Sequence, residues 1–186
     1  MTRAAPPAAE LAGLIRACDP VAVAERLPLP GPTVTYTRAP APEEWLVDGA
    51  SERPLEEHRA AHAAGRPSEA AVAYGAGVEP SAIAERLLAL AALARESGLL
   101  RAVCPVPVDP PDTARPGSWG VEDLTVVAAA RLALPDVPWV RPDWRIGAGA
   151  CQIALAFGAN DLAIPEGDRT DVATLVAAVG REAVER

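Results

Sequence analysis

The side chains that can do chemistry in this 186-residue chain are few and widely spaced. Asp109, Asp161 and His62 can act as acid or base, and Asn160 beside Asp161 can bind a polar ligand. Asn and Asp also cap helices and turn chains, so a structural role for this pair is the stronger interpretation. No Ser-His-Asp arrangement, P-loop or paired-carboxylate motif stands out, which argues against a self-sufficient hydrolase or kinase.

Two histidines, His58 and His62, share one face of a predicted helix at the spacing of metal ligands. Arg59 occupies the position where a zinc-protease helix carries a glutamate, and the sequence offers no evident third ligand. The pattern therefore favours packing of His62 at the helix end, and we predict no metal site.

Two glycines, Gly147 and Gly149, follow a predicted strand and open a predicted helix. Their backbone amides can hold a phosphate or carboxylate group. Gln152 stands where a dinucleotide-binding fingerprint has its third glycine, and a close turn between helix and strand explains the glycines equally well. Anion binding and a structural turn both remain open.

Composition and cysteine usage restrict the class of protein. The net charge of -8 argues against a nucleic-acid surface. The longest apolar run, Leu87 to Ala94, falls far short of the roughly 20 residues that span a bilayer, and the start lacks a secretion signal. Cys18, Cys104 and Cys151 are an odd number at wide spacings, as expected of buried thiols in a reducing compartment. We therefore expect a cytoplasmic protein that contacts neither nucleic acid nor membrane.

Strand-like and helix-like runs alternate from Trp45 onward. Such alternation implies parallel strands covered by helices. We expect residues 1–42 to be a Pro/Ala-rich segment with short helices and one strand, and residues 43–186 to form a single domain. The predicted helices are Leu11 to Cys18, Val21 to Leu27, Leu55 to Ala64, Pro80 to Ser97, Val121 to Leu134, Gly149 to Phe157 and Asp171 to Val184. The predicted strands are Thr33 to Thr37, Trp45 to Val47, Ala70 to Tyr74, Trp139 to Trp144 and Leu162 to Ile164, with a further apolar run at Leu100 to Val108.

Three stretches match, in order and spacing, the motifs of one group of radical S-adenosylmethionine (SAM) enzymes. They are Glu57 to Gly65 with the following Ala73-Tyr74-Gly75, then Arg131 to Pro135 with Trp144 and Gly147, and finally Gln152 to Leu162. The chain from Pro54 to Ile164 thus resembles the group that contains aminofutalosine synthase, dehypoxanthine futalosine cyclase and the deazaflavin-cofactor synthase. The first two belong to the futalosine route to menaquinone.

This resemblance implies an α/β fold, a partial (open) TIM-type (β/α) barrel of mainly parallel strands. Barrel enzymes collect functional groups at the carboxyl ends of their strands. We therefore expect a ligand pocket there, for a small polar ligand. Its predicted residues are Tyr74, Asp109, Asp112, Trp144, Gly147, Gly149, Asn160 and Asp161.

The chain departs from this group in two places. The group binds a [4Fe-4S] cluster through a Cys-x-x-x-Cys-x-x-Cys loop, which this sequence lacks, so we predict neither the cluster nor SAM as a cofactor. The residues 163–167 also replace the Gly-Gly-Thr and acidic pair that usually follow the last motif.

Three functions are compatible with these departures. The first is a noncatalytic relative, a pseudoenzyme, that binds a small ligand or a full-length radical SAM partner in menaquinone biosynthesis. The second is an enzyme with non-radical acid/base chemistry in the inherited pocket, and the third is a structural remnant without ligand. Because an open barrel has exposed edge strands, we also expect a homodimer or attachment to a partner.

Overall fold

The computed structural model describes residues 5–28, 30–39, 54–108 and 120–186. Within these ranges, no helix combines the length and the apolar character that crossing a lipid bilayer requires. The predicted strand Trp45 to Val47 lies outside the described residues. The helices are α1 (Ala8–Ala17), α2 (Pro20–Ala24), α3 (Leu55–Ala63), α4 (Pro80–Ser97), α5 (Val121–Ala133), α6 (Ala148–Ala154) and α7 (Val172–Ala177), with 3-10 turns at Trp144–Ile146 and Leu155–Phe157. The strands are β1 (Thr33–Ala39), β2 (Ser68–Gly75), β3 (Leu100–Val108), β4 (Trp139–Val140), β5 (Asp161–Pro165) and β6 (Glu182–Glu185).

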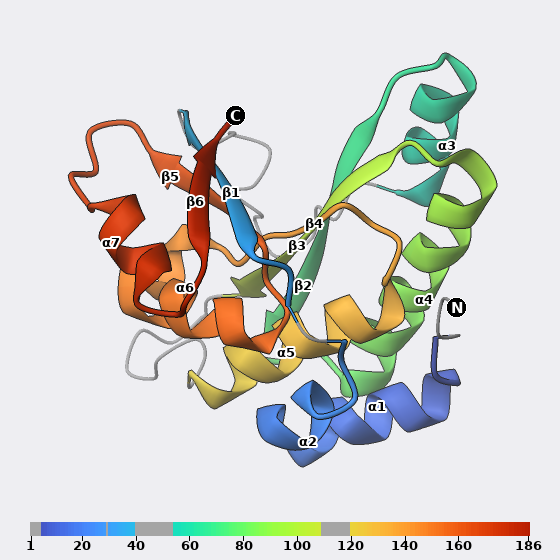
Figure 1. The fold of residues 1–186 in the computed structure, drawn as a ribbon. Helices are drawn as coiled ribbons and strands as arrows, with labels where there is room; N and C mark the ends of the chain where they lie inside the picture. The colour runs from blue at the N-terminus through green and yellow to red at the C-terminus, as the bar shows by residue number, and fades with distance from the viewer. Residues whose placement is uncertain (1–4, 29, 40–53, 109–119) are drawn as a thin grey trace.

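The strands form two separate sheets of three strands, ordered β5-β1-β6 and β2-β3-β4 (Figure 1). Every ladder in both sheets is parallel, so the predicted α/β class with parallel strands is confirmed. Strand β1, near the start of the chain, is the middle strand of the first sheet. Helices α1 and α2 contact α4 and α5, along the bottom of the view in Figure 1.

The prediction of a partial TIM-type barrel is wrong, because the strands in the described part of the chain form two separate sheets and not one continuous sheet. The break falls at β4, which has only two residues and, among the described strands, pairs with β3 alone. Pro138 and Pro142 flank this strand, and a proline has no N–H to donate to a ladder. A single backbone hydrogen bond of 3.1 Å, from Asn160 N to Val140 O, links β4 to the residue before β5.

The prediction of one C-terminal helix from Asp171 to Val184 is also wrong, because the helix is shorter and a strand follows it. Helix α7 begins after the N-cap Asp171, whose side chain accepts from the backbone N–H of Thr174, and it ends at Ala177. Gly180 has a φ of +72°, a left-handed conformation that stops a helix. The chain then enters β6, which pairs in parallel with β1.

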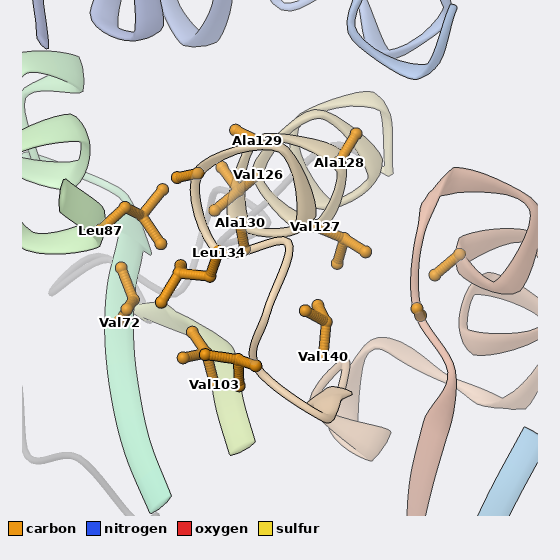
Figure 2. Close-up of a cluster of buried hydrophobic side chains, with 14 of the residues drawn as sticks. Val72, Leu87, Val103, Val126, Val127, Ala128, Ala129, Ala130, Leu134 and Val140 are labelled. Carbon is orange, nitrogen blue, oxygen red and sulfur yellow. The ribbon is translucent and has the colours of Figure 1, made fainter. Parts of the chain in front are cut away.

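Most of the hydrophobic core lies between the helices and the helix-facing side of β2, β3 and β4. Side chains from each of these strands, Val72, Val103 and Val140, meet Leu87 of α4 and the underside of α5 (Figure 2). The same cluster includes side chains of the other sheet: Val34, Leu162 and Ile164. Both sheets therefore share one core although their ladders are separate.

Candidate functional site

Tyr74, a predicted ligand-binding residue, is buried rather than open to a pocket. It is 1% exposed, and its hydroxyl donates a hydrogen bond of 2.6 Å to Asp123 Oδ1 on α5. Burial, and next the negative charge of Asp123, raises the pKa of the Tyr74 phenol well above its usual range. Tyr74 therefore joins β2 to the covering helix. The predicted ligands Asp109 and Asp112 lie outside the described residues.

Trp144 lies at the carboxyl ends of β1 and β5, the edge where the sequence predicts it. Its indole Nε1 donates a 2.9 Å hydrogen bond to Asp168 Oδ2, in the loop after β5. Hydrogen bonds from Thr170 and Trp144 lower the pKa of the Asp168 carboxyl. Arg38, near the end of β1, donates to the backbone carbonyls of Asp168 and Thr170. These contacts hold the loop after β5 against the strand ends.

Gly147 and Gly149 differ in what their positions require. Gly147 has a φ of +96°, which side chains rarely adopt, and its carbonyl accepts from Cys151 N at 3.0 Å. Gly149 lies inside α6 with ordinary backbone geometry and open space around it. The positive φ of Gly147 is reason enough for a glycine there, with no need for a bound anion. Helix α6, with seven residues, is also short for an anion site at its amino end.

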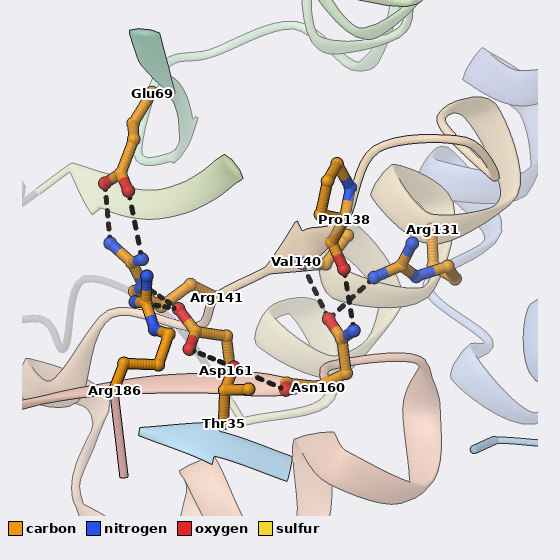
Figure 3. Close-up of polar contacts among 9 residues, drawn as sticks. All are labelled: Thr35, Glu69, Arg131, Pro138, Val140, Arg141, Asn160, Asp161 and Arg186. Carbon is orange, nitrogen blue, oxygen red and sulfur yellow. Dashed lines mark hydrogen bonds and ion pairs between the residues drawn. The ribbon is translucent and has the colours of Figure 1, made fainter. Parts of the chain in front are cut away.

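Asn160 lies at the amino-terminal start of β5, so the expectation that it sits at the carboxyl-end mouth is wrong. Its Oδ1 accepts from Arg131 Nη2 at 2.7 Å and from Val140 N at 2.9 Å. Its Nδ2 donates to Pro138 O at 2.8 Å (Figure 3). Both ends of the side-chain amide are therefore used to bind β4 and α5 to β5.

Asp161, the next residue, is fully buried at the amino end of β5. Its Oδ2 faces Arg141 Nε at 2.5 Å and Arg186 Nη2 at 3.0 Å, and its Oδ1 accepts from the Thr35 hydroxyl (Figure 3). The expectation that Asp161 lies at the carboxyl end of a strand is therefore wrong too. Asp161 is the first residue of β5, where it pairs with Thr35 of β1.

A charge network extends from Asp161 into the other sheet. The Arg141 side chain, 3% exposed, follows β4 and also donates to both carboxylate oxygens of Glu69 on β2, at 2.7 and 3.2 Å. The Arg186 guanidinium lies 4.0 Å above the ring of Trp139. We call Glu69, Arg141, Asp161 and Arg186 the inter-sheet network. Its formal charges balance, so the buried charges of Arg141 and Asp161 are compensated within the network.

The sequence gives only a weak signal for Glu69 and Arg141, which we did not predict as site residues. Each borders a buried strand, Glu69 just before Ala70 and Arg141 just after Val140. A buried charged residue such as Arg141 is normally paired, whereas Glu69 is exposed and gives no such indication. The partners are 72 residues apart in sequence, so spacing does not reveal the pair.

The two histidines converge on one hydroxyl group. His58 Nδ1 and His62 Nε2 each lie 2.8 Å from Ser68 Oγ at the start of β2. Both rings are buried, and burial lowers the pKa of His62. The prediction that His62 packs at the helix end is confirmed. Because Asp161 is bonded to arginines and a threonine instead, His62 and Asp161 are not brought together as an acid and base.

The three cysteines lie on three different elements. The expectation of buried thiols is confirmed for Cys104 on β3 and Cys151 on α6. It is wrong for Cys18, which is exposed at the end of α1. Burial raises the pKa of both buried thiols well above neutrality, so they are protonated at pH 7. Metal ligation requires the thiolate. Over residues 5–28, 30–39, 54–108 and 120–186, no group of three His, Cys, Asp or Glu residues is arranged to hold a metal ion.

A cleft of about 440 Å³ opens at the other end of the strands. Its wall includes Thr33 at the start of β1, Asn160 before β5 and Arg181 before β6, together with Arg131 from the end of α5. The cleft thus lies at the amino ends of β1, β5 and β6. Asn160 is the one predicted ligand-binding residue among the residues that line it.

Comparison with known proteins shows a similarity over part of the chain. No family model matches the chain. The chain is 32% identical over 113 residues to 5-amino-6-(D-ribitylamino)uracil--L-tyrosine 4-hydroxyphenyl transferase 1 from Methanosarcina barkeri (strain Fusaro / DSM 804). The match covers 55% of this chain and 30% of that enzyme, so this chain spans less than a third of its relative. This weak similarity loosely fits the radical SAM superfamily over part of the chain.

Proposed function

We propose that this chain is a noncatalytic relative of the radical SAM enzymes of the futalosine route to menaquinone, and that it binds a small ligand or a partner enzyme of that route. The partial similarity to a radical SAM-type transferase and the motifs from Pro54 to Ile164 support the ancestry. The observation that carries the noncatalytic role is the pairing of Asp161 with Arg141 in the inter-sheet network.

Acid/base chemistry needs a side chain with a free lone pair or proton that faces a substrate. Both carboxylate oxygens of Asp161 accept hydrogen bonds from protein groups, and the residue is fully buried. Tyr74 and Asp123 likewise bond each other. The polar side chains of Asp161 and Tyr74, which belong to the matched motifs, are therefore used in contacts within the protein. This favours a binding role over a catalytic one.

Radical SAM chemistry needs three cluster thiolates held by one loop. In this chain two thiols are buried and protonated on different elements, and the third is exposed on α1. The test is anaerobic reconstitution with iron and sulfide, followed by metal analysis and visible absorption. We expect iron well below one cluster per chain, and no difference when Cys18, Cys104 and Cys151 are all replaced by Ser. A cluster near one per chain that the triple variant loses would overturn the noncatalytic role.

The binding role is tested by thermal unfolding in the presence of futalosine-type compounds. A ligand that binds the folded state stabilises it by RT ln(1 + [L]/Kd), so Tm rises with the logarithm of the ligand concentration above Kd. We expect a concentration-dependent rise with one of these compounds, or complex formation with a purified radical SAM enzyme of the route in analytical ultracentrifugation. If neither occurs, the placement in menaquinone biosynthesis fails.

Open sheet edges motivate the proposal of a homodimer or partner complex. In the described ranges, no strand pairs with the outer edge of β2, which has eight residues, or with the outer edge of β6. Unpaired N–H and C=O groups on such an edge can pair with another chain. Light scattering at micromolar concentration checks this, and a stable monomer that also binds no partner would contradict it.

A further inference from the structure

The cleft at the amino ends of β1, β5 and β6 holds two arginines without an acidic partner. Arg131 is half-buried and Arg181 is 9% exposed, and both line the cleft. Neither forms an ion pair in the described residues, in contrast to Arg141 and Arg186. Buried cations are normally paired with an anion, so two unpaired guanidinium groups in one cleft require an explanation.

Arg181 is held by backbone carbonyls from two sides of the cleft. Its Nη1 donates to Leu155 O and Ala159 O at 3.2 and 2.9 Å, after α6. Its Nε and Nη2 donate to Gly31 O and Thr33 O at 2.9 and 2.6 Å, at the entry to β1. These acceptors are neutral, so they fix the guanidinium in place and leave its charge uncompensated.

Arg131 is fixed in the same way from the end of α5. Its Nε, Nη1 and Nη2 donate to Gly158 O, Val137 O and Asn160 Oδ1 at 3.1, 2.8 and 2.7 Å. Burial, and next the positive charge of Arg181, lowers the pKa of Arg131 to about 10. The direction of this shift agrees with a buried cation that lies near a second cation and forms no ion pair in the described residues.

Unused donors remain on both side chains. A guanidinium carries five N–H groups. The bonds described above leave two N–H groups on Arg131 and one on Arg181 without a protein acceptor in the described residues. Guanidinium donors match the oxygens of carboxylates and phosphates.

We propose that this cleft is a binding site for a small organic anion, whose carboxylate or phosphate group lies between Arg131 and Arg181. The volume of about 440 Å³ is within the range of small-molecule sites. The remaining wall is largely apolar, with Leu27, Pro30 and Pro135, and accommodates an apolar body attached to the anionic group. The cleft lies at the amino ends of the strands, opposite the edge where the resemblance predicts a pocket. The proposal of this site therefore does not rest on the proposed function.

The test compares small aromatic probes with and without an anionic group. Benzoate and phenyl phosphate carry the two anionic groups on the same ring, and benzamide is the neutral counterpart. Each is titrated at concentrations up to about 10 mM, with binding followed by calorimetry and Tm. We expect at least one anion to bind and raise Tm while benzamide does not, and the tighter anion identifies the preferred group. Equal responses to the anions and benzamide, or no response to any, would overturn the proposal.

A variant of the wall tests the location without disturbing the arginines. Ala156 is exposed on the 3-10 turn Leu155–Phe157 and lines the cleft, so Ala156→Glu places a carboxylate beside the two cations. We expect anion affinity to fall about tenfold or more. Two controls are expected to bind anions nearly as well as the parent. Ala156→Gln adds a side chain of the size of glutamate without its charge, and Ala63→Glu adds the same charge on the exposed surface of α3. Parent-like binding by Ala156→Glu would place the anion elsewhere and overturn the proposal.

Discussion

Arg141 is the residue on which the inter-sheet network depends, because it contacts carboxylates of both sheets. Asp161 is fully buried, and removal of its closest cation leaves a buried charge largely uncompensated. We expect Arg141→Met to lower the free energy of unfolding by about 3 to 5 kcal/mol in urea titrations. Arg186→Met, at a side chain that is 26% exposed, should cost only about 1 kcal/mol. Equal losses for the two variants would show that Arg141 has no special role.

His62 gives the stability of the fold a pH dependence with a defined sign. Burial lowers its pKa in the folded state, so the unfolded chain binds the proton at a higher pH. The contribution of neutral His62 is therefore complete above the unfolded value of about 6.5 and is lost as pH falls below it. We expect urea midpoints to decline from pH 7 to pH 5, and His62→Gln to flatten this decline. An unchanged slope in His62→Gln would assign the pH dependence to other groups.

At this scale, local spacing predicted some roles and missed others. The helical spacing of His58 and His62 correctly placed them on one face, and the capping chemistry of Asn160 correctly favoured a structural role. The ends of the strands were harder to predict. Asp161 was expected at the carboxyl end of a barrel strand, but its place at the start of β5 is set by a ladder with β1, more than a hundred residues earlier.

Among the connecting elements, the turn at Gly158 is held by both backbone geometry and packing. Its φ is +101°, and an added Cβ would lie 2.8 Å from Arg131 Cβ and 3.0 Å from Leu27 Cδ1. We expect Gly158→Ala to destabilise the protein by about 2 kcal/mol or more. Gly149→Ala is the matched control, since that glycine is helical and has open space, and it should stabilise by about 0.5 to 1 kcal/mol. Thermal unfolding measures both, and similar effects in the two variants would contradict the argument.

Helices with clear stop signals were predicted closely. Helix α4 matches its prediction at both ends, with Pro80 in the first turn and Gly98 in a left-handed conformation after the last. Strand β6 was missed, because the run from Val172 to Val176 is helical and nothing local shows that Glu182 to Glu185 will pair instead. That pairing is with β1, and the backbone of Pro32 accepts from Glu182 N at 2.8 Å.

The whole-molecule topology was the least predictable property of the chain. Alternating elements correctly indicated parallel strands, yet the same alternation is compatible with one curved sheet or with two sheets. The outcome depends on the short strand β4 between two prolines, and on the insertion of β1 between β5 and β6. The first feature is local but weak, and the second is a contact between the two ends of the chain.

Because the sheets share one core, we expect them to unfold together. Leu162 of β5 and Leu90 of α4, which packs with the other sheet, are both fully buried in the same cluster. Leu162→Ala and Leu90→Ala should each lower stability by about 2 to 5 kcal/mol. Native-state hydrogen exchange distinguishes joint from separate unfolding, since each variant should reduce protection in β1 and in β3 by similar amounts. If Leu162→Ala reduced protection only in β5, β1 and β6, the inter-sheet network and the common core would not couple the sheets, and each would be an independent unit.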